Sequence, residues 1–287
     1  MLSLKQAVDA LNVKYPNSAI GAFNFNDMTD MQGVMNAALH TRQPCIMMVS
    51  TGSVKYMGIH FVREMCQAAR MSTDVPLYLM LDHSESVETC ALCIDNGFSL
   101  VMYDGSALPY TENVRNTREV IRMAHARGVL VEAEIGRLPG REENIDVSAM
   151  DALFTDPKEA KAFWEETGAD LLAISFGTAH GFYKSKPCLN FDVIRKTREL
   201  TDAPLVMHGG TGVPDEDVRT AISCGVKKVN IGTEIKHAYV TALREALALL
   251  PKEIDPRKIL GPARDAVQKA VEGRLAVLQT PRTEQLA

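Results

Sequence analysis

Leu77-Tyr-Leu-Met-Leu-Asp-His83 is a run of apolar residues that ends in an acid and a histidine. A short and nearly continuous apolar run predicts a strand that is buried on both faces, as the strands of parallel sheets are. The residues that follow, up to Asn96, change to a helical pattern. The stretch therefore predicts one strand–helix unit of an α/β fold, with polar side chains at the carboxyl end of the strand.

The same unit recurs along the chain. We predict eight strands, at residues 19–25, 45–50, 77–82, 100–104, 130–134, 171–176, 205–208 and 228–231. Helical patterns separate them, at residues 28–41, 59–71, 87–96, 112–127, 157–167, 191–200 and 216–224, and a final helix begins near Thr233. Eight such units favour a closed (β/α)8 TIM barrel over an open Rossmann sheet.

All residues, 1–287, fit a single domain, because barrels of this type reach this length. Residues 252–279 lie beyond the eight units, and a helical run from Pro262 predicts a C-terminal arm that packs on the barrel or contacts another subunit. We expect the polar tail at 280–287 to be disordered. Residues 136–156 form a long connection, of the kind that often serves as a lid or a binding loop.

Charge and composition limit the partners. The formal net charge is −5, which argues against non-specific nucleic-acid binding. No apolar run approaches the length of a membrane span, and the first residues do not have the pattern of a signal peptide. The 6 cysteines show no secretory spacing, and Cys90 and Cys93 fall in an apolar helical pattern, where a buried reduced pair is expected. We therefore expect a cytoplasmic protein without nucleic-acid or membrane partners.

Polar residues gather where the predicted strands end. They are Asn24, Ser50, Asp82, His83, Asp104, Glu134, His180, His208 and Asn230. In a (β/α)8 barrel the carboxyl ends of all strands meet at one mouth, where active sites form. A single Asp or Asn there is more simply explained as the N-cap of the next helix. So many positions, three of them histidines, predict a shared site instead.

Three of these residues have the properties of metal ligands. Three neutral imidazoles with one open position are the ligand set of a catalytic zinc site, and His83, His180 and His208 provide it. The other four histidines lie in or beside helical patterns, and we interpret them as structural. Asp104 and Glu134 have two interpretations, and the residues alone leave both open. They either complete a second metal position or orient a histidine ring by accepting a hydrogen bond from its N–H.

Asp82 is the candidate general acid/base. Neighbouring side chains on a strand point to opposite sides, so Asp82 and His83 share the mouth only if the chain turns at the end of the strand. A free carboxylate beside a metal ion is suited to moving a proton. The alternative interpretation is that Asp82 caps the helix that begins near Glu85.

Glycine-rich turns follow the last two strands. Their residues are Gly209, Gly210 and Thr211 after the seventh strand, and Asn230, Ile231, Gly232 and Thr233 after the eighth. Backbone N–H groups of such turns, and of a helix that starts there, are suited to bind a phosphate. The loops after strands seven and eight are where barrels commonly hold one. Gly181 and Lys184 come just after His180, and we expect them to border the same pocket.

A metal ion, a phosphate site and a free carboxylate at one mouth suit reversible carbon–carbon bond cleavage. The metal ion would polarise a ketone and stabilise the enediolate that cleavage leaves. Asp82 would take the proton from the hydroxyl next to the breaking bond. A Schiff-base route needs a lysine at a strand end, but Lys227 and Lys228 begin the eighth strand, away from the mouth. The metal route is therefore the simpler one.

Eight motifs follow one another along nearly the whole chain, from about Leu4 to about Leu278. They are Gly-Ala-Phe-Asn (21–24), Leu-Asp-His (81–83), Val-Met-Tyr-Asp-Gly-Ser (101–106), Val-Glu-Ala-Glu-Ile-Gly (131–136), Gly-Thr-Ala-His-Gly (177–181), His-Gly-Gly-Thr-Gly (208–212), Lys-Val-Asn-Ile-Gly-Thr (228–233) and Asp-Pro-Arg-Lys (255–258). This ordered series resembles the class II, metal-dependent ketose-bisphosphate aldolases, which include the fructose- and tagatose-bisphosphate enzymes.

The resemblance implies roles for residues at the mouth. The three histidines hold one catalytic zinc ion, and Asp82 is the general acid/base. Asp104 and Glu134 match additional metal-site carboxylates, which allow a second metal site. The dihydroxyacetone phosphate half of the substrate binds at Gly181, Gly209–Thr211 and Asn230–Thr233. In the family a monovalent cation, Na⁺ or K⁺, often supports that phosphate.

Two further residues, Glu142 and Arg257, also gain roles from the resemblance. Glu142 falls where the family has a mobile-loop acid that handles the enediolate proton. Its alternative interpretation is an exposed loop charge. Arg257 matches a position that reaches the site of a neighbouring subunit, so a homodimer or a homotetramer is implied.

The aldehyde half departs from the family pattern. Ser50, Ser53 and Lys55 fit neither the fructose nor the tagatose version closely, and Tyr103 replaces a small aliphatic residue. With Arg257, the serines and Lys55 predict that this end of the substrate carries an anion. Fructose 1,6-bisphosphate, its tagatose epimer and 6-deoxy-6-sulfofructose 1-phosphate, which would give sulfolactaldehyde, are all open. One inverted hydroxyl changes binding by only a few kcal/mol, below what motifs resolve.

We therefore expect a zinc-dependent class II aldolase that reversibly cleaves a ketose 1-phosphate or 1,6-bisphosphate to dihydroxyacetone phosphate and an aldehyde. The alternative enzyme is a metal-dependent sugar-phosphate isomerase or epimerase, because an enediolate serves both reactions. A barrel that acts only as a binding or assembly subunit is disfavoured, because Asp82 and all three histidines are present.

Overall fold

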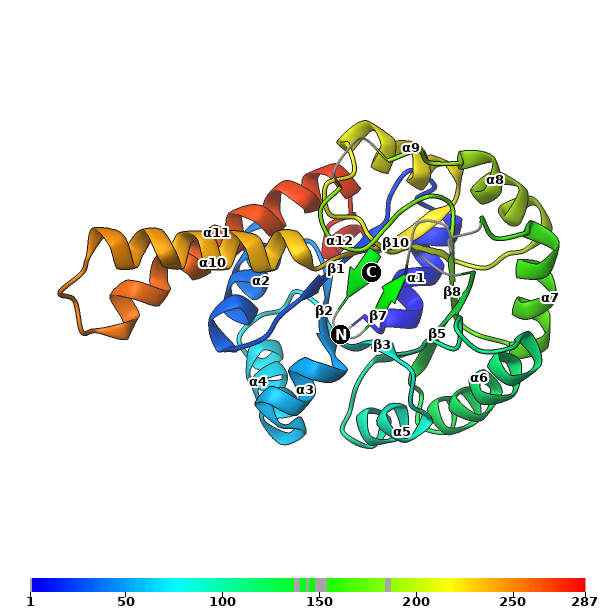
Figure 1. The fold of residues 1–287 in the computed structure, drawn as a ribbon, viewed down its shortest axis with the longest axis horizontal. Coiled ribbons are helices and arrows are strands. Elements are labelled where there is room, and N and C mark those ends of the chain that lie inside the picture. Colours follow the sequence, from blue (N-terminus) through cyan, green and yellow to red (C-terminus); the bar gives the residue numbers. More distant parts are fainter. Residues whose placement is uncertain (1, 137–139, 143–144, 148–153, 184–186, 287) are drawn as a thin grey trace.

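The core of the molecule is a closed barrel of parallel strands (Figure 1). This computed structural model describes residues 2–136, 140–142, 145–147, 154–183 and 187–286. The barrel strands are β1 (Ile20–Asn24), β2 (Cys45–Ser50), β3 (Leu77–Ser84), β4 (Leu100–Tyr103), β5 (Leu130–Ile135), β8 (Leu171–Ile174), β9 (Leu205–Met207) and β10 (Val226–Ile231). They follow one another around the barrel in chain order, and β10 closes it by pairing with β1. The predicted (β/α)8 barrel is confirmed.

Helices surround the barrel (Figure 1). Those of the ring are α2 (Met28–Thr41), α3 (Thr51–Met57), α4 (Ile59–Met71), α5 (Val87–Asp95), α6 (Tyr110–His125), α7 (Pro157–Thr167), α8 (Phe191–Leu200) and α9 (Asp215–Cys224). Four of them, α2, α4, α7 and α8, begin and end at the predicted residues. The sequence did not predict α3, nor the small hairpin of β6 (Gly140–Glu142) and β7 (Ile145–Val147) in the long connection. Among the described residues, no helix is both long and apolar enough to cross a membrane.

Alternate side chains of each strand point into the barrel, because the side-chain period of a strand is two. Many of these side chains form an apolar cluster with the N-terminal helix α1 (Leu4–Val13). This helix closes the end of the barrel away from the mouth. Leu4 and Leu11 of α1 belong to one buried cluster with Ile20 and Ile46 of the strands. The sequence did not predict α1, although Ser3 and Gln6 form a capping box at its start. The interior also holds polar side chains, among them the fully buried Glu132 and Lys228.

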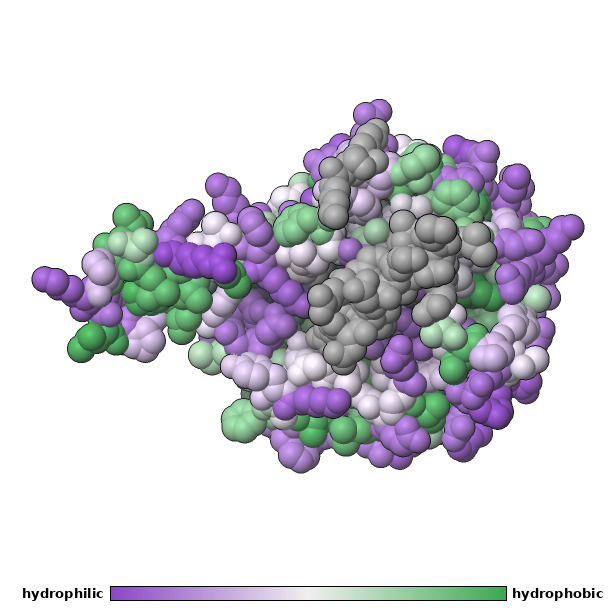
Figure 2. All heavy atoms as spheres, in the orientation of Figure 1, coloured by the Kyte–Doolittle hydropathy of each residue, from purple (hydrophilic) through white to green (hydrophobic). Residues whose placement is uncertain are grey.

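Two helices leave the barrel side by side and form an arm (Figure 1, orange). They are α10 (Thr233–Leu249) and α11 (Pro256–Leu278), so α11 covers most of the segment 252–279. The predicted helix start at Pro262 was wrong, because Asp255 caps the helix, Pro256 occupies its first turn and Pro262 lies inside it. Apolar side chains are exposed at the tip, among them Leu249 and Ile254 (Figure 2, green).

The second half of α11 returns to the barrel and packs against α2. Gly33 permits this approach, because a Cβ there would lie 2.7 Å from the side chain of Val267 and 2.8 Å from the carbonyl oxygen of Arg264. His40 of α2 also contacts α11, since its Nδ1 lies 2.8 Å from Oε1 of Glu272. The base of the arm is therefore part of the helix ring, and only its outer half projects.

The tail at 280–287, predicted to be disordered, is instead packed over residues 280–286. The hydroxyl of Thr280 donates a hydrogen bond to the carbonyl of Ala19 at 2.6 Å. The short helix α12 (Thr283–Leu286) places Leu286 in a buried position, and Glu284 pairs with Arg42 at 2.5 Å. A polar composition concealed these anchors, because one buried leucine and one ion pair give no periodic pattern.

Candidate metal and substrate site

A pocket opens at the carboxyl ends of the barrel strands. It is lined by Asn24, Asp82, His83, His180, Gly181, His208, Gly209, Thr211, Asn230, Gly232 and Thr233. They come from β1, β3 and β10 and from the segments that follow β8, β9 and β10. Every lining residue belongs to the set that the sequence predicted. Residues far apart in the chain are thus brought to the mouth where barrels hold their active sites.

Asp82 and His83 both line this pocket although they are neighbours on β3. The pairing of β3 with β4 shifts register between Leu81 and Ser84, and His83 has a φ of 41°. A left-handed backbone is uncommon for a residue with a side chain, and such an irregularity re-aims the side chains around it. The chain therefore turns at the end of the strand, which the shared mouth requires.

The imidazoles of His83, His180 and His208 converge in the pocket. The ring centre of His83 lies 4.9 Å from that of His180 and 4.5 Å from that of His208. Nδ1 of His208 lies 2.6 Å from Nε2 of His83. One nitrogen of each ring lies within 4.8 Å of the others, a spacing that a single ion can bridge.

The protonation of His208 suits a metal ligand. Burial lowers the pKa of His208, and the neighbouring His83 lowers it further. The neutral imidazole is the form that binds a metal ion. Three nitrogen donors that converge from separate strands leave further positions open to solvent or substrate, so the residues fit a catalytic zinc-type site.

Carboxylates orient two of the three rings. Nδ1 of His83 lies 3.0 Å from Oδ2 of Asp104, and Nε2 of His208 lies 2.8 Å from Oε1 of Glu132. Each ring therefore turns its other nitrogen toward the shared centre, as metal-binding histidines do. Burial alone would raise the pKa of Asp104, but the hydrogen bond and charge of His83 outweigh burial and hold that pKa well below its usual range.

Asp104 and Glu134 lie close to the same centre. With His83 they form a second group whose ligand atoms all lie within 4.8 Å of one another. The contact of Asp104 with His83 supports the orienting interpretation, and the grouping with Glu134 keeps the second metal position open. The sequence analysis missed Glu132. The available signal was the alternation of Glu132 and Glu134 on one strand, which turns both into the barrel.

The carboxylate of Asp82 is held by two amide groups. Nδ2 of Asn24 donates to one oxygen at 2.9 Å, and Nδ2 of Asn230 donates to the other at 3.0 Å. Asp82 is only 2% exposed. The alternative interpretation, that Asp82 caps the next helix, is wrong, because Ser86 caps α5 by accepting a hydrogen bond from the N–H of Thr89.

Backbone groups suited to a phosphate also line the pocket. Gly209 has a φ of 65°, and a Cβ there would collide with the carbonyl oxygen of Ala179, so only glycine lets these two loops approach. Thr211 accepts a hydrogen bond from the N–H of Glu234 at 3.2 Å and so joins the loop after β9 to the first turn of α10. The N-terminus of α10, a 17-residue helix, thereby faces the pocket at Gly232 and Thr233. Helix N-termini bind anions.

Two residues of the predicted phosphate turns have other contacts. The N–H of Gly210 donates to the carbonyl of Asn230 at 3.2 Å, so this N–H is already used within the protein. The side chain of Ile231 belongs to the buried cluster outside the barrel wall. Of Ile231, only backbone atoms remain for a ligand.

Three residues predicted for the aldehyde half or a neighbouring site are not among the residues that line this pocket. The hydroxyls of Ser50 and Ser53 lie 2.9 Å apart at the start of α3, where Ser50 is the N-cap. Arg257 lies on the outer part of the arm, and its side chain is 88% exposed and pairs with Asp255 at 2.8 Å. The side chain of Glu142 and all of Lys184 lie outside the described residues.

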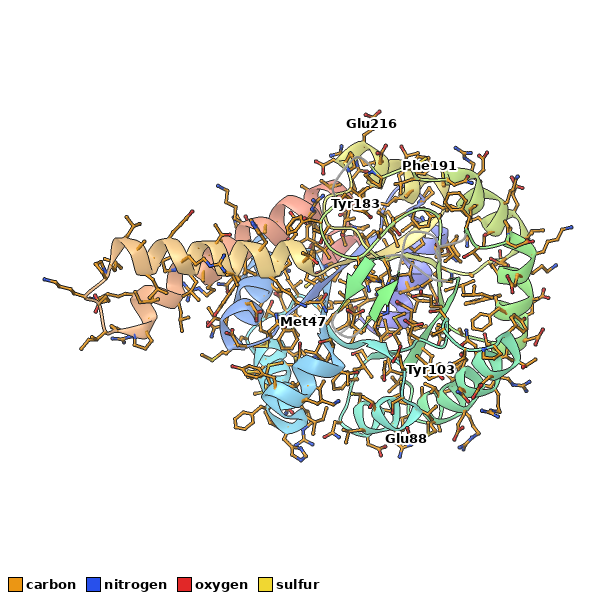
Figure 3. All side chains as sticks on the ribbon, viewed as in Figure 1. Met47, Glu88, Tyr103, Tyr183, Phe191 and Glu216 are labelled. Carbon is orange, nitrogen blue, oxygen red and sulfur yellow. The ribbon has the colours of Figure 1, made fainter. Side chains whose placement is uncertain are left out.

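Tyr183 bridges two loops of the site and was not predicted (Figure 3). Its hydroxyl accepts a hydrogen bond from the N–H of Ala179 at 2.8 Å and donates one to the carbonyl of Gly209 at 3.0 Å. Burial raises the pKa of Tyr183 to about 12, so the hydroxyl keeps the proton that it donates. The signal in the sequence was only a tyrosine three residues after a histidine ligand.

Tyr103 does not lie at the mouth, although the sequence analysis placed its substitution near the aldehyde half. It belongs to the buried cluster outside the barrel wall, and its hydroxyl accepts a hydrogen bond from Nδ2 of Asn116 on α6 at 2.8 Å (Figure 3). Tyr103 is the last residue of β4 and points away from the barrel interior, so it contacts the helix layer instead of the pocket.

Comparison with known proteins agrees with this geometry. The family described as "Fructose-bisphosphate aldolase class-II" matches residues 5–282. A fructose-bisphosphate aldolase of Geobacillus stearothermophilus is 43% identical over 281 residues, which cover 96% of each chain. Among solved structures, the YdjI aldolase from Escherichia coli K12 has a TM-score of 0.85 at 31% identity over 99% of both chains. A putative fructose-1,6-bisphosphate aldolase from Coccidioides immitis has a TM-score of 0.89 at 26% identity, over 99% of this chain and 98% of that one.

Proposed function

The chain belongs to the class II fructose-bisphosphate aldolases, and we propose that it is a zinc-dependent enzyme that cleaves a ketose 1-phosphate or 1,6-bisphosphate reversibly to dihydroxyacetone phosphate and an aldehyde. One observation carries this proposal. The converging imidazoles of His83, His180 and His208 share a pocket with the carboxylate of Asp82 and with a helix N-terminus. The proposed metal, base and phosphate sites therefore share one pocket, which supports their action on one small substrate.

The three histidines would hold the catalytic ion. Bound there, zinc would act as a Lewis acid that polarises the substrate ketone and offsets the negative charge that cleavage leaves on the three-carbon fragment. Asp104 and Glu132 contact the other nitrogen of two of these rings and would keep the rings in place for the ion. Glu134 and Asp104 would also serve a second position for the ion near His83.

Asp82 would perform the proton transfer. In the cleavage direction its carboxylate takes the proton of the hydroxyl on C4, the C3–C4 bond breaks, and its electron pair passes to the fragment that keeps the phosphate on C1. The oxygen of C4 becomes the carbonyl of the aldehyde. Asn24 and Asn230 donate to both carboxylate oxygens and so hold Asp82 in one orientation toward the pocket. In the condensation direction Asp82 returns the proton.

The phosphate on C1 would bind between Gly181, Gly209, Thr211 and the first turn of α10. Its negative charge is stabilised there by N–H groups and by the positive end of a long helix. The chain as a whole has a net charge of −5, so this local arrangement is what attracts the anion. A monovalent cation, Na⁺ or K⁺, would add to it.

Fructose 1,6-bisphosphate is the first substrate to test, because the similar aldolase from Geobacillus stearothermophilus is named for it. Its tagatose epimer and 6-deoxy-6-sulfofructose 1-phosphate differ at the aldehyde half, for which Ser50, the strand partner of Asp82, and Ser53 are candidate contacts. Each substrate would place an anion at that end. The residues that line the pocket therefore do not determine which of the three substrates the enzyme prefers.

A homodimer or homotetramer would complete the aldehyde end of the site. Arg257 lies on the arm with an exposed side chain, away from the pocket of its own chain. Exposed Leu249 and Ile254 give the arm tip an apolar surface that a second copy would cover (Figure 2). Light scattering coupled to size exclusion tests the assembly, and a monomer at assay concentration would contradict it.

A cleavage assay with and without a chelator tests the proposed function. The three ketose phosphates are assayed in parallel, and dihydroxyacetone phosphate is measured. Chelator-sensitive formation of two three-carbon products from any of them supports the aldolase, and an isomerised six-carbon product supports an isomerase instead. No reaction with any substrate, in protein that carries zinc, would contradict the proposal.

A further inference from the structure

Lys228 is fully buried inside the barrel, below the pocket. Its position on β10 pairs with Ile20, whose side chain belongs to the interior cluster. Nζ of Lys228 lies 2.8 Å from Oε2 of Glu132, which is also fully buried. Buried charges are costly unless they are paired and hydrogen-bonded, so a lysine at this depth requires an explanation.

One contact of Lys228 leads to the base. Nζ also donates a hydrogen bond to Oδ1 of Asn230. A primary amide accepts at its oxygen and donates at its nitrogen, so an oxygen held by a cation leaves the NH2 group on the other side. That NH2 group donates to Oδ1 of Asp82 at 3.0 Å. Lys228 thus determines which end of the Asn230 amide faces the carboxylate.

The other contact of Lys228 leads to a metal ligand. Glu132 binds Lys228 through one oxygen and accepts from Nε2 of His208 through the other, at 2.8 Å. Nδ1 of His208 is thereby left for the metal centre, 2.6 Å from Nε2 of His83. Each oxygen of Glu132 thus faces a nitrogen that can donate to it, so the carboxylate acts as an acceptor on both sides.

We propose that Lys228 is a positioning residue that aligns the base Asp82 through Asn230 and the metal ligand His208 through Glu132. This inference rests on the proposed function, because alignment of Asp82 matters only if Asp82 transfers a proton. The competing explanation is that Lys228 only neutralises Glu132 and has no effect on the amide. The two explanations differ in the kcat that they predict when both charges are removed together. Neutralisation alone predicts an unchanged kcat, and alignment predicts a lower one.

The main variant is Lys228→Met/Glu132→Gln, which removes both charges and keeps an oxygen that His208 can donate to. Replacing both members of a buried pair is tolerated far better than breaking it, so this variant is expected to fold. Lys228→Gln/Glu132→Gln is the second pair, in which an amide keeps a donor directed toward Asn230. Lys227→Met is the matched control. Nζ of Lys227 donates to the carbonyl of Pro16 at 2.6 Å, at the end of the barrel opposite the site.

Turnover separates the two explanations. In Lys228→Met/Glu132→Gln we expect kcat per bound metal to fall about 100-fold, the scale of a misplaced catalytic group. In a protein that already carries Asn230→Ala, the same pair of changes should lower kcat less than about threefold, since residues that act as a unit are not additive. The Gln/Gln pair should recover at least about tenfold of the loss. Lys227→Met should leave kcat per bound metal unchanged.

Metal affinity tests the branch through Glu132 without any turnover. Competition with a coloured chelator should show zinc binding weakened about tenfold in the Met/Gln pair, the size of an outer-partner effect. Lys227→Met should bind zinc as the wild type does. If the wild type cleaves no ketose phosphate, the proposed function fails. The zinc affinities still show whether Lys228 and Glu132 position His208.

Two results would overturn the inference. One is a Met/Gln pair whose kcat and zinc affinity both stay within about threefold of the wild type. The other is a loss of kcat that adds in full to that of Asn230→Ala, which would show that Lys228 does not act through the amide. Should the Met/Gln pair not fold, Lys228→Leu/Glu132→Gln replaces it as the pair without a donor at position 228, and the same two results decide the inference.

Discussion

Tyr183 and Gly209 are joined by a hydrogen bond of 3.0 Å from the tyrosine hydroxyl to the backbone carbonyl. The same hydroxyl accepts from the N–H of Ala179 at 2.8 Å, next to the ligand His180. Gly209 directly follows the ligand His208. One phenol group therefore holds together the two segments that carry the proposed metal ligands His180 and His208 and border the proposed phosphate site.

Tyr183→Phe should loosen these segments while keeping the ring packed. Two hydrogen bonds contribute about 1 kcal/mol each, so the melting temperature should fall by a few degrees. We expect KM for the ketose phosphate to rise more than kcat falls, because the contacts border the phosphate half. Steady-state kinetics and calorimetry measure both. Equal KM values for variant and wild type would show that the bridge does not shape the phosphate site.

Asp82→Ala should keep the metal and lose most turnover. The carboxylate is held by Asn24 and Asn230, and the nitrogens that would hold the metal belong to the three histidines. We expect kcat to fall about 100- to 10 000-fold, the usual contribution of a general base. Metal content by mass spectrometry is the control for an intact site. Turnover near that of the wild type would show that another residue is the general base.

His208→Ala should lose both metal and turnover. It removes one of three converging nitrogens and also the partner of Glu132. The loss of affinity should exceed the roughly 10- to 100-fold effect of removing an outer partner. Dialysis followed by metal analysis measures it, with the exposed His40→Ala as the control. A full equivalent of retained zinc would show that the ligand set is wrong.

Lys227→Met should change how stability depends on pH. Burial, together with the nearby charge of Arg198, lowers the pKa of Lys227 from 10.5 to about 8. Between these values the unfolded chain binds more protons at this group than the folded chain, so its contribution to stability rises with pH from about 8 to 10.5. The free energy of unfolding in urea is measured for wild type and variant at several pH values. The difference between the two proteins gives the contribution of Lys227. A difference that stays constant across this window would contradict the shift.

The barrel could be predicted because its signal is local and repeated. Runs such as 45–50 and 77–82 are buried on both sides, so each strand is apolar throughout, and the helices 157–167 and 191–200 have polar caps at their starts. The helix α1 was missed because its buried face contacts strands of the barrel interior and resembles no ring helix. The break between α10 and α11 was misplaced because two prolines, Pro256 and Pro262, each offered a helix start.

The site could be predicted only where its residues stand at strand ends. His83, His180 and His208 follow apolar runs, and the chain order of the barrel brings such positions together. Glu132 and Lys228 stand within strands, and their importance follows from meeting each other across the barrel at 2.8 Å. No spacing in the sequence reports that distance. Residues that orient the site are therefore the part that needed three-dimensional coordinates.

The left-handed backbone at His83 links the stability of the fold and the proposed catalytic activity to the same residue. A φ of 41° costs a residue with a side chain on the order of 1–2 kcal/mol relative to glycine. His83→Gly would relieve this cost, but it would also remove the proposed metal ligand and the partner of the buried Asp104. A laboratory selection that rewards only survival at high temperature does not report turnover, so libraries of this chain need a turnover screen in every round.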